Sequence, residues 1–208
     1  AYYGTKGARN YGYSINEVPR DLYTDAVRAS YEAYADAALV VISRSGGEGQ
    51  DLPTSMKDFC EADDRHYLEL TVEEEALLEE VCDGGFGKVI VLLNVGTTME
   101  MGEVQADDGV DAVVWMGFPG STGVMAVGQV LIGKMTDGTA FSPSGHTVDT
   151  WAADFTQDPT WYNTGIYGSE FGNRYLYGGG SAAGHGQGEE HRQLCRQGRG
   201  AALLQRAV

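Results

Sequence analysis

Three apolar runs of strand length divide the chain, at residues 37–42, 88–93 and 112–116. Runs that lack alternating polar positions are typical of strands covered on both faces, as in a parallel sheet. Each run is preceded or followed by a segment with helical spacing of its apolar residues. The pattern therefore predicts strands that alternate with helices.

The helical segments are recognised by spacing and by their ends. Before the first run, four apolar residues repeat at intervals of four and three after Pro19: Leu22, Ala26, Ala29 and Ala33. Thr71 and Glu74 have the spacing of a capping box, and the helix they open is expected to end near Gly84. An apolar helix is also expected after Pro119. We predict an α/β fold, a three-layer sandwich with a mostly parallel sheet and helices on both faces.

The loops after Ile42, Leu93 and Met116 are the expected ligand sites, because ligands of such folds bind at the carboxyl ends of the strands. A length of 208 residues suits one well-buried domain. We predict three regions: an irregular lead-in over 1–19, the sandwich domain over 20–165, and an irregular tail over 166–208.

The last part of the chain has a different composition. All 21 aromatic residues lie at or before Tyr177, and four arginines follow it. After about residue 178, three interpretations stay open: disorder, a short terminal helix at 201–208, and a shifted reading frame in the gene. We assign no chemistry to this tail.

Charge and cysteine content narrow the function classes. The net charge of −16 argues against nucleic acid and against an anionic membrane as partners, whereas a neutral ligand such as a sugar is compatible with it. The sequence shows neither a membrane-spanning apolar stretch nor a secretory signal. Three unpaired cysteines and four histidines without ligand spacing predict no disulfide framework, metal site or cofactor, and favour a reducing, cytoplasmic compartment.

The loop after the first run carries one prominent carboxylate, Glu48. Glycines at 46, 47 and 49 allow a tight turn and leave this side chain little shielded, so that it lies on a loop and not on a helix face. From spacing alone, the simpler interpretation is a solvated turn residue, with Asp51 as an ordinary cap.

Other candidate sites have weaker signals. The glycine-rich segments 84–88 and 117–123 lack the ending of a phosphate-binding loop, and Ser121 and Ser144 lack the nucleophile-elbow pattern. Trp115 is predicted to lie in the core. Trp151 and Trp161 could equally pack a domain face or stack on a sugar.

Five segments, in order, cover roughly residues 20–165 and resemble one family. They are Ser43–Asp51 with its Ser-Arg and Gly-Glu-Gly, Tyr67–Val81, Lys88–Gly102, Val114–Gly123 with its Trp and Pro-Gly, and Pro143–Trp151 with its Pro-Ser-Gly. Together they resemble the second, (α/β) sandwich domain of glycoside hydrolase family 3. This chain differs from the closest form of the loop pattern by a Gly at position 46 or 47.

The resemblance implies a β-glucosidase-like, retaining, exo-acting enzyme in which Glu48 is the general acid/base. The nucleophile of that family is an aspartate on a (β/α)₈ barrel domain, and no barrel-sized segment is present here. We therefore expect a fragment that is inactive alone, with a glycoside substrate and the missing barrel of the same parent protein as partners. Two alternatives stay open: a non-catalytic sugar-binding or interaction module, and a flavodoxin-like binder of an anionic ligand.

Overall fold

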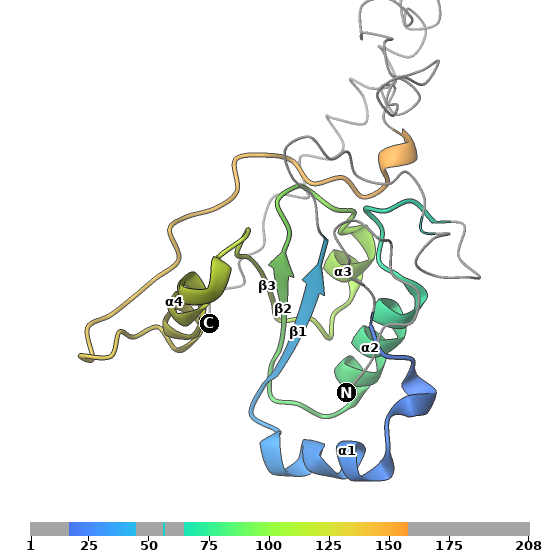
Figure 1. Ribbon diagram of the computed structural model, residues 1–208, viewed down its shortest axis with the longest axis horizontal. Helices are drawn as coiled ribbons and strands as arrows, with labels where there is room; N and C mark the ends of the chain where they lie inside the picture. The colour runs from blue at the N-terminus through green and yellow to red at the C-terminus, as the bar shows by residue number, and fades with distance from the viewer. Residues whose placement is uncertain (1–16, 45–55, 57–64, 158–208) are drawn as a thin grey trace, which may run out of the picture.

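The computed structural model describes residues 17–44, 56 and 65–157 (Figure 1). Within these ranges three parallel strands form one sheet in the order β1-β2-β3. They are β1 (Ala38–Ser43), β2 (Val89–Asn94) and β3 (Ala112–Trp115). The three apolar runs thus form the three strands, as predicted.

The strand register brings the ends of the strands together at one edge. Ser43 lies opposite Asn94, and Leu93 lies opposite Trp115. Because all three strands run in the same direction, their carboxyl ends share this edge. The loops that the sequence analysis selected therefore leave the sheet side by side.

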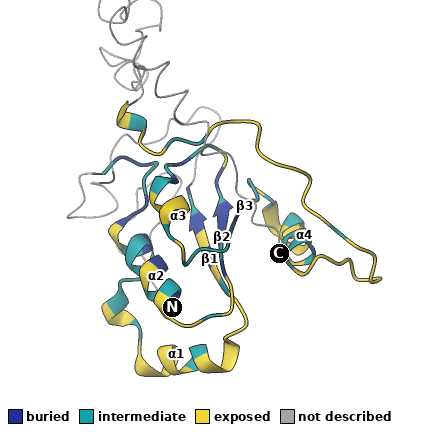
Figure 2. Ribbon diagram, turned by 180° about the vertical axis from the view of Figure 1, so that it is seen from behind, coloured by how far each residue is buried: buried dark blue, intermediate teal, exposed yellow. Residues whose placement is uncertain are grey.

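Helices lie on both sides of the sheet. α2 (Val72–Asp83) and α3 (Gly102–Ala106) lie on one side, and α4 (Gly120–Ile132) lies on the other (Figures 1 and 2). Thr71 and Glu74 form the expected capping box at the start of α2, and the helix ends at Gly84. The fold is an α/β sandwich with a parallel sheet, which confirms the predicted class.

The helix expected after Pro19 is broken into three short pieces. A 3-10 turn at Arg20–Leu22 is followed by α1 (Asp25–Ala29) and by a second 3-10 turn at Ser30–Tyr34. Tyr23 is extended, and Thr24 caps a new start by accepting a hydrogen bond from Val27. None of the three pieces buries a residue, so no packing of an apolar face stabilises one longer helix.

The core lies between the sheet and the pair α2 and α3 (Figure 2). Alternate residues of the strands face it, and α2 contributes Leu78 and Val81. The strand residues in the core are Val40, Ile42, Val89, Val91, Leu93 and Val113. This period of two is what one buried face of a sheet produces.

The other face of β1 is more open than its apolar sequence predicts. Leu39 and Val41 are 50% and 47% exposed, although Leu92 in the central strand is buried. β1 is an edge strand of the described sheet, and α4 buries none of its own residues. Burial on both faces is therefore not seen at β1 within the described residues.

Among the helices that the structure describes, none combines the length and the apolar character needed to span a membrane. The predicted boundary at residue 165 and the tail over 166–208 lie outside the described residues, as does most of the lead-in over 1–19.

Candidate functional site at the carboxyl edge of the sheet

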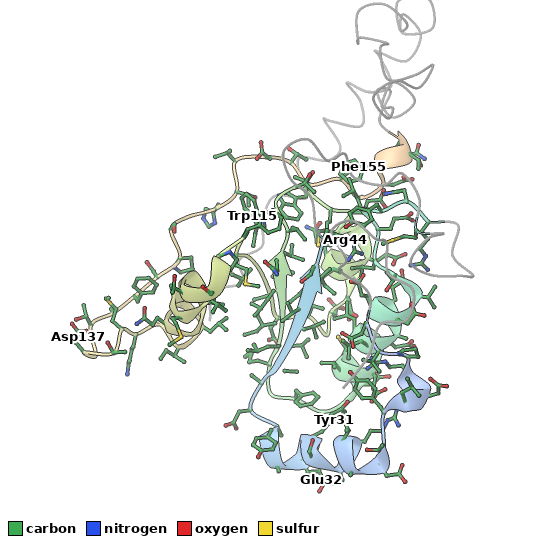
Figure 3. All side chains as sticks on the ribbon, viewed as in Figure 1. Tyr31, Glu32, Arg44, Trp115, Asp137 and Phe155 are labelled. Atoms are coloured by element: carbon green, nitrogen blue, oxygen red, sulfur yellow. The ribbon has the colours of Figure 1, made fainter. Side chains whose placement is uncertain are left out.

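The candidate site is the edge at which β1, β2 and β3 end. Arg44 follows β1 directly, and Trp115 is the last residue of β3; Figure 3 shows both side chains at this edge. The sequence-predicted Glu48 belongs to the segment 45–55, which lies outside the described residues. The structure therefore describes the two ends from which that segment departs.

Arg44 is a buried guanidinium whose five N–H groups all have acceptors. Its Nη atoms hold the Glu74 carboxylate in a two-pronged ion pair, with 2.7 Å from Nη1 to Oε1 and from Nη2 to Oε2. Nε donates to the carbonyl of Tyr67 at 2.8 Å, and the remaining N–H groups donate to the carbonyls of Ser43 (2.7 Å) and Glu69 (2.5 Å). A guanidinium 2% exposed is compatible with burial only because its charge and all its donors are matched.

Glu74 connects this ion pair to the start of α2. Its Oε2 also accepts the backbone N–H of Thr71 at 2.9 Å, while Thr71 Oγ1 accepts the N–H of Glu74 at 3.0 Å. The carboxylate near a helix N-terminus is stabilised by the helix dipole as well. One residue therefore closes the capping box and neutralises Arg44.

Met56 marks the other end of the segment 45–55. It is fully buried, and its backbone N–H donates to the carbonyl of Arg65 at 2.7 Å. Arg65 in turn donates to the carbonyl of Leu70 at 2.9 Å and forms an ion pair with Glu75 of α2. Both flanks of the segment that carries Glu48 are thus held close to the first turn of α2.

A second polar cluster at this edge contains His66, Glu69 and Glu100. His66 Nε2 lies 2.8 Å from Glu100 Oε1 and 3.5 Å from Glu69 Oε2. Among the described residues, these three form a group whose donor atoms all lie within 4.8 Å of one another, a spacing that could hold a metal ion. Histidine spacing along the sequence did not indicate this cluster, since Glu100 lies 34 residues from His66.

Hydrogen bonds within the protein hold the side chains of this cluster. His66 Nδ1 accepts the N–H of Leu68 at 3.2 Å, which leaves the proton of a neutral ring on Nε2, where it faces Glu100. Glu69 Oε2 accepts the backbone N–H of His66 at 2.6 Å. The three residues therefore belong to one hydrogen-bonded network.

The chain near residues 152–155 returns across this edge. Met101 donates its N–H to the carbonyl of Ala152 at 3.1 Å, and Phe155 donates its N–H to the carboxylate of Glu100. The Phe155 ring also lies edge-on to His66, with 6.0 Å between ring centroids. The polar network thus joins the loop after β2 to the last described segment.

Trp115 differs from its prediction as a core residue. It is 45% exposed, its Nε1 donates to the carbonyl of Val95 at 2.7 Å, and its ring packs edge-on against Trp151 at 6.0 Å between centroids. The exposure follows from its place at the end of β3, an edge strand of the described sheet. Phe118, on the next loop, is 57% exposed.

The remaining candidates add no matched chemical group to this edge among the described residues. The glycine-rich segment 84–88 precedes β2 and lies at the amino end of the strands, whereas 117–123 follows β3 at the carboxyl edge. Ser121, Ser144 and His146 are exposed. Burial, followed by the nearby Asp107 carboxylate, raises the pKa of the Cys82 thiol to about 11, so this thiol is protonated at neutral pH. Trp161, His185 and His191 lie outside the described residues.

Sequence comparison gives a match to a known domain. Residues 12–185 match the family described as the glycosyl hydrolase family 3 C-terminal domain. The chain is 31% identical over 158 residues to β-glucosidase A of Butyrivibrio fibrisolvens, and 36% identical over 126 residues to a β-glucosidase of Ruminococcus albus. It is 28% identical over 123 residues to β-xylosidase/α-L-arabinofuranosidase 1 of Medicago sativa subsp. varia.

These relatives are much longer proteins. The matches cover 69%, 61% and 59% of this chain, but only 17%, 12% and 14% of the Butyrivibrio, Ruminococcus and Medicago proteins. The chain therefore spans less than a fifth of the length of each of these relatives.

Proposed function

Because the chain belongs to glycosyl hydrolase family 3, whose C-terminal domain it matches over residues 12–185, we propose that it is the sandwich domain of a retaining, exo-acting β-glycosidase of the β-glucosidase type. Glu48 is the general acid/base in this proposal. The nucleophile is supplied by a (β/α)₈ barrel domain of the same parent protein, as the family resemblance implies.

The assignment of Glu48 as acid/base is supported by the position of Arg44. Arg44 is buried at the carboxyl edge of the sheet, and Glu48 follows it by four residues. Four residues span at most about 14 Å, so covalent geometry alone keeps Glu48 near this edge. Loops at this edge are where α/β folds present their functional groups.

The chemistry requires two carboxyl groups about 5 to 5.5 Å apart across the scissile bond. The nucleophile attacks the anomeric carbon while Glu48 protonates the leaving oxygen, and Glu48 then removes a proton from the water that releases the sugar. For the first step its carboxyl must hold a proton near neutral pH. Burial under a docked barrel and the negative charge of the nucleophile both raise the pKa of a carboxyl group.

A glycoside is a fitting substrate for the parent protein. The relatives are named as β-glucosidases and as a β-xylosidase/α-L-arabinofuranosidase. A neutral sugar is also not repelled by a domain with a net charge of −16.

The test uses the parent polypeptide, in which residues 1–208 are joined to the barrel. With 4-nitrophenyl β-D-glucopyranoside and alkyl glucosides as substrates, Glu48→Gln is expected to lower kcat/KM for the alkyl glucosides by about 10² to 10⁴. Asp51→Asn also removes one negative charge from the segment after β1, and it is expected to change kcat/KM for the alkyl glucosides by less than about tenfold. If Glu48→Gln hydrolyses alkyl glucosides as well as the unaltered enzyme does, the assignment is wrong.

The isolated 208-residue chain gives a second test. It lacks the partner carboxylate of the proposed site, so we expect no hydrolysis of 4-nitrophenyl β-D-glucopyranoside above the uncatalysed rate. Turnover by this chain that Glu48→Gln abolishes would contradict the proposed division of the site between two domains.

A second candidate function, a non-catalytic sugar-binding module, is favoured by the exposure of Trp115 next to the loops of the site. Exposed tryptophan rings stack on the apolar faces of sugars. This function predicts that the isolated chain binds glucosides, and that Trp115→Ala removes binding while Glu48→Gln does not. Isothermal titration with β-methyl glucoside and cellobiose distinguishes it from the catalytic proposal.

A further inference from the structure

Two exposed aromatic side chains lie close together at the carboxyl edge of the sheet. Trp115 is the last residue of β3 and is 45% exposed (Figure 3). Phe118, on the loop between β3 and α4, is 57% exposed. Aromatic rings gain much free energy from burial, so two neighbouring rings left in solvent need a reason. We call Trp115 and Phe118 the aromatic platform.

Both rings of the aromatic platform contact the same part of the loop after β2. Trp115 Nε1 donates to the carbonyl of Val95 at 2.7 Å. The Phe118 ring rests on the next residue, Gly96, where an added Cβ would lie 2.3 Å from Phe118 Cε2. Because Val95 and Gly96 are consecutive, the two rings lie beside one peptide unit of this loop.

The loop that carries Phe118 turns sharply on either side of it. Gly117 and Gly120 have φ of +61° and +65°, in the left-handed region that other residues rarely adopt. A side chain at position 96 would overlap the Phe118 ring. The place of this ring therefore depends on glycines in two different loops.

The stretch of chain around the aromatic platform carries no charge. None of the residues 112–133, which contain β3, the following loop and α4, is charged, although the net charge of the chain is −16. Such a surface suits a neutral ligand with apolar faces. The ring hydroxyls of a β-D-glucopyranoside are equatorial, so both faces of the sugar present C–H groups that stack on aromatic rings.

The exposure of the two rings indicates which sugar of a glycoside they suit. A pocket encloses most of the surface of a small ligand, whereas these rings form an open surface. Exo-acting hydrolysis requires a pocket that is closed behind the terminal sugar, but the leaving group extends away from it. The end of β1 lies two strands from the end of β3, about 10 Å away, so the platform borders the proposed site.

We propose that the aromatic platform stacks on the leaving-group sugar of a disaccharide or longer glycoside, and that it sets a preference for glycosyl over alkyl leaving groups. This inference rests on the proposed glycosidase function. It gives the two rings a part in binding and none in proton transfer. The terminal sugar is common to all substrates and is not held by the platform.

The test compares two substrates of the parent polypeptide that share the terminal sugar. Cellobiose offers a leaving-group sugar to the aromatic platform, whereas methyl β-D-glucopyranoside offers a methyl group. The readout is the ratio of kcat/KM for cellobiose to kcat/KM for methyl β-D-glucopyranoside. This ratio does not depend on the fraction of folded enzyme, so a variant that folds poorly still gives a valid result.

Three variants change the platform in different ways. Phe118→Leu and Trp115→Leu each remove an aromatic ring and keep an apolar side chain, whereas Gly96→Ala keeps the Phe118 ring but displaces it from the loop. For each variant we expect the ratio to fall about three- to tenfold, the effect of losing one aromatic contact. The fall should come mainly from a higher KM for cellobiose.

Met125→Ala is the matched control. Met125 is 75% exposed on α4, in the same uncharged stretch, and is not part of the aromatic platform. This variant should leave the ratio unchanged. If Met125→Ala lowers the ratio as much as Phe118→Leu does, a general loss of apolar surface accounts for the effect and the platform is wrong.

The other outcomes separate this inference from the function on which it rests. If the platform variants lower kcat/KM for both substrates by the same factor, as a contact with the barrel domain would require, or change neither value, the platform is wrong and the proposed function stands. If the unaltered parent polypeptide hydrolyses neither substrate, the proposed function fails and this inference fails with it.

Discussion

Gly87 and Gly96 are two positions at which an added Cβ would meet a close neighbour, and the kind of neighbour differs. At Gly87 the Cβ would lie 2.8 Å from the backbone carbonyl oxygen of Asp36. At Gly96 it would lie 2.3 Å from Phe118 Cε2, but this ring is 57% exposed and can rotate away. The shorter contact is therefore the one that the protein can relieve.

We expect Gly87→Ala to lower the free energy of unfolding by about 1 to 3 kcal/mol, because a backbone carbonyl has to move. Gly96→Ala should cost less than about 1 kcal/mol, because only an exposed side chain moves. Urea unfolding of the two variants followed by circular dichroism measures both values. A larger cost at Gly96 would mean that the Phe118 ring is held in place.

At the scale of one residue, the sequence motif marks Arg44 but does not reveal the residue with which it pairs. The Ser-Arg pair before Gly46 and Gly47 is part of the family resemblance, so the sequence marks this position. For its partner Glu74 the sequence predicts only a helix cap. Glu74 serves both as cap and as counter-ion because the end of β1 lies beside the start of α2, and spacing along the sequence does not encode this arrangement.

At the scale of elements, α2 and α1 differ in how they begin. Thr71 is fully buried and takes part in a reciprocal capping box with Glu74. Thr24 accepts one hydrogen bond, from Val27 at 3.3 Å, on an exposed surface. The local sequence signal was stronger for α2, and α2 is the longer and better packed helix.

Thr71→Ala should reduce the free energy of unfolding by about 1 to 2 kcal/mol, since it removes the acceptor for the Glu74 N–H in a buried setting. Thr24→Ala should reduce it by less than about 0.5 kcal/mol, because solvent replaces the lost acceptor. Thermal unfolding of both variants, with Thr71→Ser as a control that retains the hydroxyl, measures the difference. Equal effects at the two positions would show that burial does not strengthen the cap.

At the scale of the whole molecule, the excess of acidic groups affects stability. The net charge is −16, and like charges meet where α2 packs beside α3. There a hydrogen bond to the Glu75 carboxyl, together with the negative charge of that group, raises the pKa of Glu103, while Arg65 partly opposes the shift. A carboxyl group with a raised pKa stabilises the fold at low pH, and this contribution is lost as the pH rises through the folded-state pKa.

Glu103→Gln should therefore stabilise the protein near neutral pH and have no effect well below the pKa of Glu103, where the unaltered residue is itself protonated. The gain should be less than about 1 kcal/mol, because solvent and salt screen an exposed pair. Glu79→Gln, which removes one charge from the middle of α2, is the control for the general effect of net charge. Urea unfolding at neutral and at acidic pH measures the effect. An equal increase in the free energy of unfolding at both pH values would contradict this expectation.

The sequence by itself determined the strands, the capped helix and the family. Apolar runs and a capping box depend on residues close together in the chain, and their physical basis is local: side-chain periodicity in a strand and orphan N–H groups at a helix start. The broken segment Arg20–Tyr34 was not determined locally, because its apolar spacing forms one helix only if that face is buried, and none of its residues is buried.

Only the tertiary structure decided which distant groups meet. His66 faces Glu100, Arg44 faces Glu74 and Trp115 faces Trp151 because parallel strands connected through helices bring their carboxyl ends to one edge. The exposure of Trp115 and of one face of β1 is also a property of the assembled sheet, since an apolar run has the same sequence whether it lies at an edge or in the centre. Burial and contact arise from the arrangement of elements in space, and the pattern along the chain specifies only what each element can bury.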